Sequence, residues 1–261
     1  MQYIDCQKYA QEILDEVKDI PDKKELYILT MGNNPASQSY VKGKIKDCDY
    51  CGIPYSHIQV NTTDSLERHI HRGNTSNSVG GVIVQLPLPE GVDEELYTEC
   101  VSHFKDVDGF RAKSKFDPCT PEGIMHILHK ELGDLTGKEA LVIGKGKLVG
   151  KPLVDMLLKA GVTVTIAHSK TSDLYELLRY PRDIIVTAVG KPNLVDLTLC
   201  DATVVIDAGI SRDENGKLVG DCFNFNAEEV DCFGRHMKVT PVPGGVGLMT
   251  RAMLMKHIGE V

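Results

Sequence analysis

The amino-acid sequence predicts an α/β protein built from two doubly wound units with a cleft between them. Strand-like and helix-like patterns alternate along most of its 261 residues, which is the order expected when helices cover parallel sheets. The run Gly81-Val-Ile-Val-Gln-Leu86 is apolar without alternation, as in a parallel strand buried on both faces. A glycine-rich turn follows the strand-like segment 139–143, and this turn indicates a ligand site in the second unit.

The first unit opens with an amphipathic helix, because Ala10, Ile13, Leu14 and Val17 recur at helical spacing. Residues 26–31 then form an apolar run followed by a Gly-Asn-Asn-Pro turn, which is typical of a buried strand that ends in a loop. The remaining pattern predicts helices at 36–51, 66–71 and 94–101, and strands at 56–60 and 81–86.

The second unit begins near Thr120 and Pro121, since threonine can cap a helix and proline suits the first helical position. Its predicted helices span 121–132, 150–160 and 173–179, and its predicted strands span 139–143, 162–167, 183–188 and 203–207. A final helix at 246–257 places Leu248, Ala252 and Met255 on one face, and we expect it to pack on the first unit. The predicted domains are therefore 1–118 completed by 246–261, and 119–245.

Charge and composition exclude several classes of protein. The formal net charge of −8 argues against nucleic acid or an anionic membrane as the main partner. No apolar run approaches the roughly 18 residues that cross a bilayer, and the N-terminus has no signal-peptide core. We therefore expect a soluble, cytoplasmic protein with a sizeable core, since 42% of the residues are hydrophobic.

The eight cysteines are too sparse for a disulfide scaffold, and we expect neither a disulfide nor a metal site. Cys48 and Cys51 form the single CxxC pair, without the second pair or the histidine cluster that zinc requires. Two interpretations of this pair remain open, namely thiols packed on or under a helix and a redox-active pair.

The segment 139–152 combines a strand, a glycine turn and a helix start, which is the context that a dinucleotide-binding fingerprint requires. Gly144, Gly146 and Gly150 have the spacing GxGxxxG, one residue longer than the common form. This segment predicts that the second unit is Rossmann-like. Glycines that follow the strands at 183–188 and 203–207 would let a cofactor lie against the backbone.

The end of the next strand indicates which nucleotide is bound. It reads His168-Ser169-Lys170, without the carboxylate that usually accepts a hydrogen bond from the ribose 2′-hydroxyl of NAD. Lys145 and Ser169 suit a 2′-phosphate, so NADP is the expected cofactor. In the alternative interpretation, Lys145 and Lys170 merely face solvent.

Two further segments carry chemistry. Tyr40 and Lys44 stand four residues apart on a predicted helix, so their side chains project from one face. A buried lysine beside an aromatic ring can transfer protons near neutral pH. The loop 240–250 holds two prolines and three glycines, which let the backbone approach a flat ligand closely. Each segment alone is also compatible with a purely structural role.

Taken together, these segments closely resemble the bifunctional methylenetetrahydrofolate dehydrogenase/methenyltetrahydrofolate cyclohydrolase family. The resemblance covers 35–44, 84–89, 105–109, 118–121, 150–152, 168–171, 206–210 and 240–250. It implies an NADP-dependent enzyme that oxidises 5,10-methylenetetrahydrofolate and then hydrolyses the methenyl product to 10-formyltetrahydrofolate. It also implies tetrahydrofolate derivatives as substrates, a place in one-carbon metabolism and purine biosynthesis, and a homodimeric assembly.

The same resemblance implies a role for each site residue. Tyr40 would stack on the p-aminobenzoyl ring of the folate and Lys44 would be the general acid/base. Gln85 would hydrogen-bond Lys44, and Asp108 would anchor the pterin. Further substrate contacts would come from Val84, Leu86, Pro243, Gly244, Gly245, Val246 and Gly247. The cofactor contacts would come from Gly144, Lys145, Gly146, Ser169 and Ile210.

The chain departs from the family pattern at four places. Lys145 and Gly146 replace the usual arginine and serine, and Leu248 replaces a proline. The segment 110–117 is shorter than usual, and the N-terminus begins close to the first helix. These departures bear on the cofactor preference, the closure of the substrate loop and the ratio of the two activities.

Three alternatives remain open from the sequence. The chain could be a monofunctional dehydrogenase or cyclohydrolase of the same family, or a folate-binding homologue without catalytic turnover. It could also be an oxidoreductase similar to shikimate dehydrogenase, although such a protein would lack the segment Pro241-Val-Pro-Gly-Gly-Val-Gly247.

Overall fold

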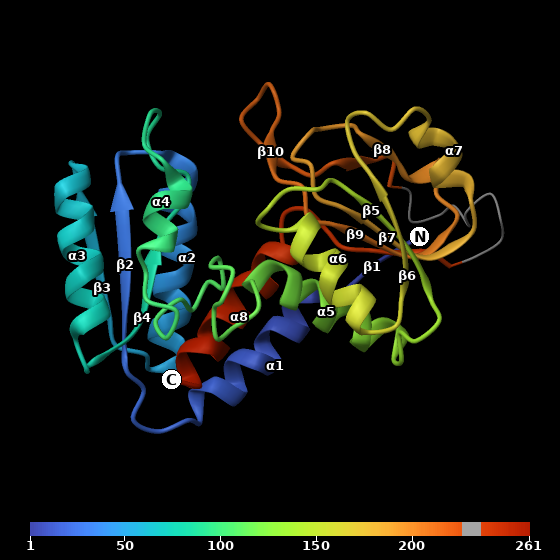
Figure 1. Cartoon of the computed structure of the whole chain (residues 1–261). Coiled ribbons are helices and arrows are strands. Elements are labelled where there is room, and N and C mark those ends of the chain that lie inside the picture. Colours follow the sequence, from blue (N-terminus) through green and yellow to red (C-terminus); the bar gives the residue numbers. More distant parts are fainter. Residues whose placement is uncertain (226–235) are drawn as a thin grey trace. The chain divides into compact units, whose positions relative to one another are not determined.

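The computed structural model describes residues 1–225 and 236–261, which divide into two compact units (Figure 1). One unit comprises Ala10–Cys119 and Arg251–Val261 and contains a three-stranded sheet. The other comprises Met1–Tyr9 and Thr120–Thr250 and contains a six-stranded sheet. We call them the three-stranded unit and the six-stranded unit.

The three-stranded unit is a parallel sheet in the order β3-β2-β4. Its sheet is covered on opposite sides by α2 and α3 (Figure 1). The side chain of Thr62 caps α3 by accepting a hydrogen bond from the Ser65 N–H. The elements are α1 (Cys6–Lys18), β2 (Glu25–Met31), α2 (Pro35–Cys51), β3 (Tyr55–Val60), α3 (Thr63–Thr75), β4 (Val79–Val84) and α4 (Glu94–Glu99).

The six-stranded unit is a parallel sheet in the order β1-β13-β9-β7-β5-β6. The chain runs from β5 outward to β6 and then returns to the other side of β5 as β7. The order of strands therefore reverses beside β5, which is where open α/β sheets bind their ligands. The larger elements are α5 (Cys119–Leu132), β5 (Glu139–Ile143), α6 (Gly150–Lys159), β6 (Thr163–Ala167), α7 (Leu174–Arg179), β7 (Arg182–Thr187), β9 (Ala202–Asp207) and α8 (Val246–Gly259).

The predicted fold class, an α/β protein with two doubly wound units, is confirmed. The long helices and strands predicted from the sequence are also present. Several boundaries move. The strand expected at 81–86 is Val79–Val84, so Gln85 and Leu86 lie beyond its end, and the helix expected at 66–71 extends over Thr63–Thr75. Short elements were not predicted, namely β1 (Gln2–Tyr3), β8 (Val195–Asp196), η1 (Leu197–Leu199), β10 (Ser211–Arg212), β11 (Leu218–Val219), β12 (Cys222–Phe223) and β13 (Lys238–Val239).

The N-terminal residues lie in a different unit from the one expected for 1–118. Strand β1 pairs in parallel with β13, and the Gln2 N–H donates to Met237 O at 2.9 Å. The Ile4 N–H donates to Val239 O at 2.9 Å, so backbone hydrogen bonds join residues 2–4 to the six-stranded sheet, and Met1–Tyr9 belongs to that unit. The division at the C-terminus falls inside α8, with Arg251–Val261 in the three-stranded unit and Val246–Thr250 in the other.

Within the part of the chain that the structure describes, no helix is both long enough and apolar enough to cross a membrane.

Candidate active site

Helix α2 holds the central pair of side chains. Pro35 begins the helix, where its fixed φ is favourable, and the Asn34 side chain accepts a hydrogen bond from the Ser37 N–H at 3.3 Å. Tyr40 is partly buried, and Lys44 follows one turn later with only 5% of its surface exposed. Lys44 Nζ lies 3.8 Å from Asp108 Oδ2, so the two residues form a buried ion pair.

Asp108 occupies an environment that disfavours its charge. The residue is 7% exposed, and burial raises the pKa of its carboxyl above the ordinary value. The Lys44 ammonium opposes this pKa shift, the Asp106 carboxylate adds to it, and His257 opposes it. A buried carboxyl with a raised pKa beside a charged partner is common at functional sites.

The turn that presents Asp108 is organised by Asp106, a residue that the sequence analysis did not single out. Its carboxylate accepts hydrogen bonds from the Gly109 N–H at 3.1 Å and the Arg111 N–H at 2.9 Å. Gly109 has φ +72°, and a Cβ there would collide with the Asp117 carbonyl. The short segment 110–117 is therefore a closed turn held at both ends, and it keeps Asp108 in place.

His257 on α8 supports the same turn. Its Nδ1 lies 2.8 Å from Val107 O and 3.5 Å from Cys119 Sγ. The imidazole stacks on Phe116, with the ring centres 4.3 Å apart. Periodicity gave no signal for this residue, because its partners lie far away in the sequence.

Gln85 follows β4 and continues its ladder by one bond, since its N–H donates to Leu29 O at 2.8 Å. Its side-chain amide donates to Leu86 O at 2.7 Å, while Oε1 is buried without a hydrogen-bond partner among the described residues. The expected hydrogen bond between Gln85 and Lys44 is absent from the described part of the chain. The Lys44 ammonium pairs instead with the buried Asp108 carboxylate. This pairing is favoured because a buried charge without a partner costs more free energy than a buried neutral amide without one.

The two neighbours of Gln85 differ in what they offer a ligand. Val84 is buried in a core cluster with Leu66 and Ile70, so its side chain is committed to packing. Leu86 is only partly buried against the same cluster.

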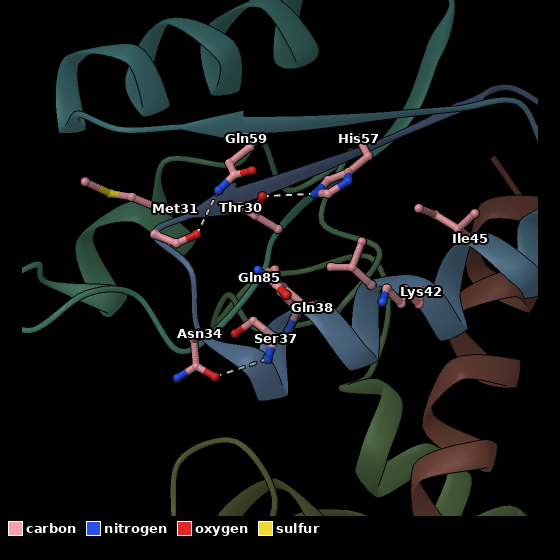
Figure 2. Close-up of a pocket in the computed structure, with 12 residues that line it drawn as sticks. Thr30, Met31, Asn34, Ser37, Gln38, Lys42, Ile45, His57, Gln59 and Gln85 are labelled. Atoms are coloured by element: carbon pink, nitrogen blue, oxygen red, sulfur yellow. Dashed lines mark hydrogen bonds between the residues drawn. The ribbon is translucent and has the colours of Figure 1, made fainter.

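A cavity of about 240 Å³ lies within the three-stranded unit, and Gln85 forms part of its lining (Figure 2). Strand residues His57 and Gln59 line it together with Ser37 and Lys42 from α2 (Figure 2). Thr30 Oγ1 lies 3.0 Å from His57 Nε2. The lining mixes polar side chains with the apolar Met31, Val41 and Ile45, and it contains no carboxylate. It is made by Thr30, Met31, Gly32, Asn34, Ser37, Gln38, Val41, Lys42, Ile45, His57, Gln59 and Gln85.

The glycine turn lies at the end of β5, where the strand order reverses. Gly144 has φ +111°, and a Cβ on it would collide with the Ala188 carbonyl. A Cβ on Gly150 would overlap the Gly144 carbonyl, so α6 can begin there only with glycine. Around Gly146 there is open space, which suits the close approach of a phosphate to the backbone. This local geometry fits a dinucleotide.

Lys145 and Ser169 are both exposed. The Gly144 N–H donates to Ala167 O at 2.9 Å, which ties the glycine turn to the end of β6, two residues before Ser169. The loop after β6 is itself ordered, because the Thr171 hydroxyl accepts a hydrogen bond from the His168 N–H at 2.9 Å. No carboxylate occurs at 168–170, as the sequence indicated.

Ile210 is 41% exposed, and its loop is fixed by two buried aspartates that the sequence analysis missed. Asp221 accepts hydrogen bonds from the Thr187 hydroxyl at 2.6 Å and from the N–H groups of Val189 at 2.8 Å and Lys191 at 2.7 Å. Asp207 accepts bonds from the N–H groups of Gly209, Asp221 and Cys222. The two carboxylates therefore hold the loops that follow β7 and β9.

The segment Pro243–Gly247 lies at the start of α8, in the six-stranded unit. Gly244 has φ +99°, and a Cβ on Gly245 would collide with the Pro241 carbonyl. The Leu248 N–H donates to Gly245 O at 3.0 Å, so leucine at this position keeps a backbone hydrogen bond that proline could not make. Gly245 and Val246 are buried, which leaves Pro243 and Gly244 as the exposed part of the loop.

The described residues contain no group of three or more His, Cys, Asp or Glu side chains suited to a metal ion. Cys48 and Cys51 are buried, free thiols on α2. Burial raises the pKa of Cys48 to about 12 and that of Cys51 to about 11. Since the thiolate is the reactive form, these values favour the packing interpretation over a redox pair.

The fold and the site thus define an α/β enzyme with a dinucleotide turn and a buried lysine–carboxylate pair. Comparison with known proteins gives the family. The family model "Tetrahydrofolate dehydrogenase/cyclohydrolase, catalytic domain" matches residues 4–108. The model "Tetrahydrofolate dehydrogenase/cyclohydrolase, NAD(P)-binding domain" matches residues 118–261.

Curated relatives and solved structures agree with this match. The bifunctional protein FolD of Campylobacter hominis is 41% identical, covering 98% of this chain and 95% of the relative. That of Agathobacter rectalis is 38% identical, covering 98% and 97%. The crystal structure of the bifunctional FolD enzyme from Campylobacter jejuni has a TM-score of 0.89 at 38% identity, covering 98% of this chain and 96% of that one. The Trypanosoma brucei enzyme, complexed with NADP and an inhibitor, has a TM-score of 0.86 at 29% identity, covering 98% and 95%.

The chain therefore belongs to the tetrahydrofolate dehydrogenase/cyclohydrolase family. Its catalytic domain contains Tyr40, Lys44, Gln85 and Asp108, and its NAD(P)-binding domain contains the glycine turn. This membership removes the alternative of an enzyme similar to shikimate dehydrogenase.

Proposed function

We propose that this enzyme oxidises 5,10-methylenetetrahydrofolate to the methenyl form with NADP and hydrolyses the product to 10-formyltetrahydrofolate. The observation that carries the proposal is the buried pair of Lys44 and Asp108, one turn from Tyr40, in the domain that matches the family's catalytic domain. A buried lysine paired to a carboxylate is a proton-transfer group held in one geometry.

The first reaction needs alignment more than acid–base chemistry. The carbon that loses hydride becomes a cation that the adjacent folate nitrogens already stabilise. Tyr40 stacks on the p-aminobenzoyl ring, and Asp108 accepts hydrogen bonds from the pterin N–H groups, so the reacting carbon is held in a fixed position. NADP, when bound, supplies the acceptor for the hydride.

The second reaction needs protons moved. Water adds to the methenyl carbon and loses a proton, and the ring then opens as the bond from that carbon to N5 breaks and N5 gains a proton. Lys44, an ammonium in its pair with Asp108, donates a proton to N5 as that bond breaks, and the neutral amine then takes up the proton that the hydroxyl loses as it becomes the formyl carbonyl. Gln85 has a buried Oε1 without a hydrogen-bond partner among the described residues, and this oxygen accepts a hydrogen bond from Lys44 when Asp108 binds the pterin. Val84 and Leu86 border the folate, with Val84 contributing its backbone because its side chain packs in the core.

The cofactor groups lie in the six-stranded unit. Gly144 shapes the turn, while Gly146 contacts the cofactor through exposed backbone and Ile210 through an exposed side chain. Lys145 and Ser169 bind the 2′-phosphate, and the absence of an acid at 168–170 removes the usual partner of an unphosphorylated ribose. NADP is therefore preferred over NAD. The glycines of Pro243–Gly247, with Val246 anchoring the loop, close over the substrate.

The proposed domains are 1–118 completed by 246–261, and 119–245, with the N-terminal strand docked on the second. We further propose that the enzyme is a homodimer, acts in the cytoplasm and supplies one-carbon units for purine biosynthesis. Light scattering on the purified protein tests the dimer, which a monomeric mass would contradict.

A spectroscopic assay tests the proposed activities directly. In one reaction the protein is incubated with 5,10-methylenetetrahydrofolate and either NADP or NAD, and the absorbance of the methenyl product is followed. In a second reaction 5,10-methenyltetrahydrofolate is supplied directly and its decay is followed. Formation with NADP and accelerated decay support both activities. Formation without accelerated decay, or the reverse, identifies a monofunctional enzyme, and neither identifies a silent folate-binding homologue.

A further inference from the structure

Arg251 on α8 packs against α2 beside Tyr40, at a position that no folate contact named above uses. The space for it exists because residue 43 is glycine. A Cβ on Gly43 would overlap the Arg251 guanidinium, with Cζ only 2.8 Å away. Helix interiors generally disfavour glycine, so this residue costs helix stability that the packing of the guanidinium must offset. Gly43 therefore has a specific function, which is to admit Arg251.

The guanidinium is only partly satisfied by the protein. Arg251 Nε lies 2.9 Å from Asp47 Oδ2, close enough for an ion pair, but its N–H is not aligned for a hydrogen bond. No hydrogen bond from either terminal nitrogen is found within residues 1–225 and 236–261. The side chain is 22% exposed, so part of this charged edge is accessible. A planar guanidinium with free N–H groups is the side chain best suited to bind a carboxylate through two parallel hydrogen bonds.

The position of Arg251 relative to Tyr40 indicates which carboxylate of a ligand the guanidinium would bind. Tyr40 and Gly43 are three residues apart on α2 and so are neighbours on its surface. The charge of Arg251 also opposes the rise in the Tyr40 pKa that burial causes, so the two side chains lie within electrostatic reach. In a folate, an amide group and one carbon separate the p-aminobenzoyl ring from the α-carboxylate of its glutamate.

We propose that Arg251 binds the α-carboxylate of the first glutamate of the folate substrate. This inference rests on the proposed function, because it takes Tyr40 as the stacking partner of the ring. Asp47 keeps the guanidinium in place from behind, and Gly43 leaves it room. Arg251 is then a specificity-determining residue that distinguishes a folate from the same pterin without glutamate.

The test compares two substrates in two variants. The substrates are 5,10-methylenetetrahydrofolate and 5,10-methylenetetrahydropteroate, which lacks the glutamate. The double variant Arg251→Met/Asp47→Asn removes the cation without leaving the buried Asp47 carboxylate unpaired. We expect the KM for the folate to rise about 10- to 100-fold, as for one charge-assisted pair, while the KM for the pteroate and both kcat values stay within about twofold.

Lys46→Met is the matched control, because Lys46 is an exposed cation on the same helix and does not line the cavity. It should leave the ratio of the two KM values unchanged. Arg251→Lys, which keeps the charge but loses the planar fork, should recover part of the discrimination. With the wild-type enzyme, a folate whose α-carboxylate is converted to the amide should bind as poorly as the pteroate, whereas the γ-amide should not.

The inference is overturned if the double variant raises the KM of both substrates equally, which is the signature of a packing role alone. It is also overturned if Lys46→Met, rather than the Arg251 variants, removes the discrimination. Turnover of the pteroate by the wild-type enzyme and the variants reports on the proposed activities independently. If the wild-type enzyme turns over neither substrate, the proposed function itself is wrong and Arg251 loses its assigned ligand.

Discussion

Replacing Lys44 with methionine should separate the two proposed reactions. Methionine keeps the length and apolar packing of the stem while removing the amine. Cyclohydrolysis moves protons at both water and N5, so it should fall by at least the roughly 10²–10⁴-fold that a general acid/base contributes. Hydride transfer uses no proton from the protein, so dehydrogenase activity should be reduced but remain measurable.

Lys44→Met should also be less stable than the wild-type protein, because it breaks a buried ion pair. Lys44 Nζ and Asp108 Oδ2 are 3.8 Å apart and both residues are buried. At an effective dielectric constant of about 20, two unit charges at that separation attract by about 4 kcal/mol, and removing one partner of a buried pair costs about 3–5 kcal/mol. Lys44→Met should therefore lower the free energy of unfolding by several kcal/mol near neutral pH, since the Asp108 carboxylate loses its counter-ion.

The pH dependence of that loss follows from Asp108. Its folded-state pKa is already raised by burial, and loss of Lys44 removes a cause that lowers it, so the folded-state pKa rises further. A folded carboxyl that holds its proton more tightly than the unfolded one contributes stability below the unfolded pKa of about 4. This contribution is lost as the pH rises through the folded pKa. Lys44→Met should thus be closer to wild type in stability at pH 5 than at pH 8.

The assays are methenyltetrahydrofolate decay, NADP-dependent methenyl formation, and denaturant unfolding at both pH values. Lys46→Met is the matched control, because it removes an exposed lysine from the same helix and should change none of the three. Lys44→Met/Asp108→Asn should recover most of the lost stability without recovering cyclohydrolysis. Methenyl-folate hydrolysis by Lys44→Met at a near wild-type rate would refute Lys44 as the proton-transfer group, whatever the stability data show.

Three further predictions concern the pterin and the cofactor. Asp108→Asn converts part of an acceptor edge to a donor, so both activities should collapse together, and tight folate binding by calorimetry with unchanged turnover would remove Asp108 from the site. Lys145→Ala should raise the KM for NADP about 10- to 100-fold, the loss of one charge-assisted contact, with NAD kinetics nearly unchanged; equal effects on both cofactors would show that Lys145 does not bind the 2′-phosphate. Asp221→Asn weakens the acceptors of three hydrogen bonds, so it should lower the free energy of unfolding by about 1–3 kcal/mol and raise the KM for NADP, while cyclohydrolysis, which needs no cofactor, should persist. Loss of both activities in parallel would assign Asp221 a global structural role instead.

The long elements were predictable because their signals are local. An apolar run such as residues 26–31 fixes a buried strand, and the glycine turn at 144–150 permits few other conformations. Strand β13 could not be predicted in this way, since a two-residue strand has no measurable period and its partners β1 and β9 are distant in sequence. For the same reason the sequence did not predict the pairing of the N-terminal strand with the six-stranded sheet.

The candidate site likewise has parts with a local sequence signal and parts that depend on long-range packing. The Tyr40 and Lys44 spacing on one helix was visible in the sequence, and the resemblance supplied Gln85 and Asp108. It did not supply the conformation of Gln85, whose amide turns to Leu86 while Lys44 pairs with Asp108. Asp106 could have been found from the Asp-Val-Asp-Gly turn, because aspartate commonly accepts backbone hydrogen bonds in such turns.

Arg251 and Gly43 show what long-range packing adds to a motif. A glycine within a helix interior carries no chemical signal by itself, and an arginine just after the loop 240–250 resembles any solvated cation. Only the folded chain places the guanidinium over Gly43, beside both Asp47 and the predicted stacking residue. The resemblance predicts that the folate ring stacks on Tyr40, and the packing of α2 shows which charged side chains lie beside that residue.

The distribution of groups between the two units has a consequence for how the activities can vary. Every group assigned to proton transfer or to the pterin, namely Lys44, Asp108 and Gln85, belongs to the three-stranded unit. Every group assigned to the 2′-phosphate or to holding the cofactor loops, including Lys145, Asp207 and Asp221, belongs to the six-stranded unit. Because cyclohydrolysis needs no cofactor, substitutions in the second set can change the dehydrogenase rate while leaving hydrolysis intact. The replacement of the family's usual arginine by Lys145 falls in this second set, so its effect should be confined to the first reaction and to the choice between NADP and NAD.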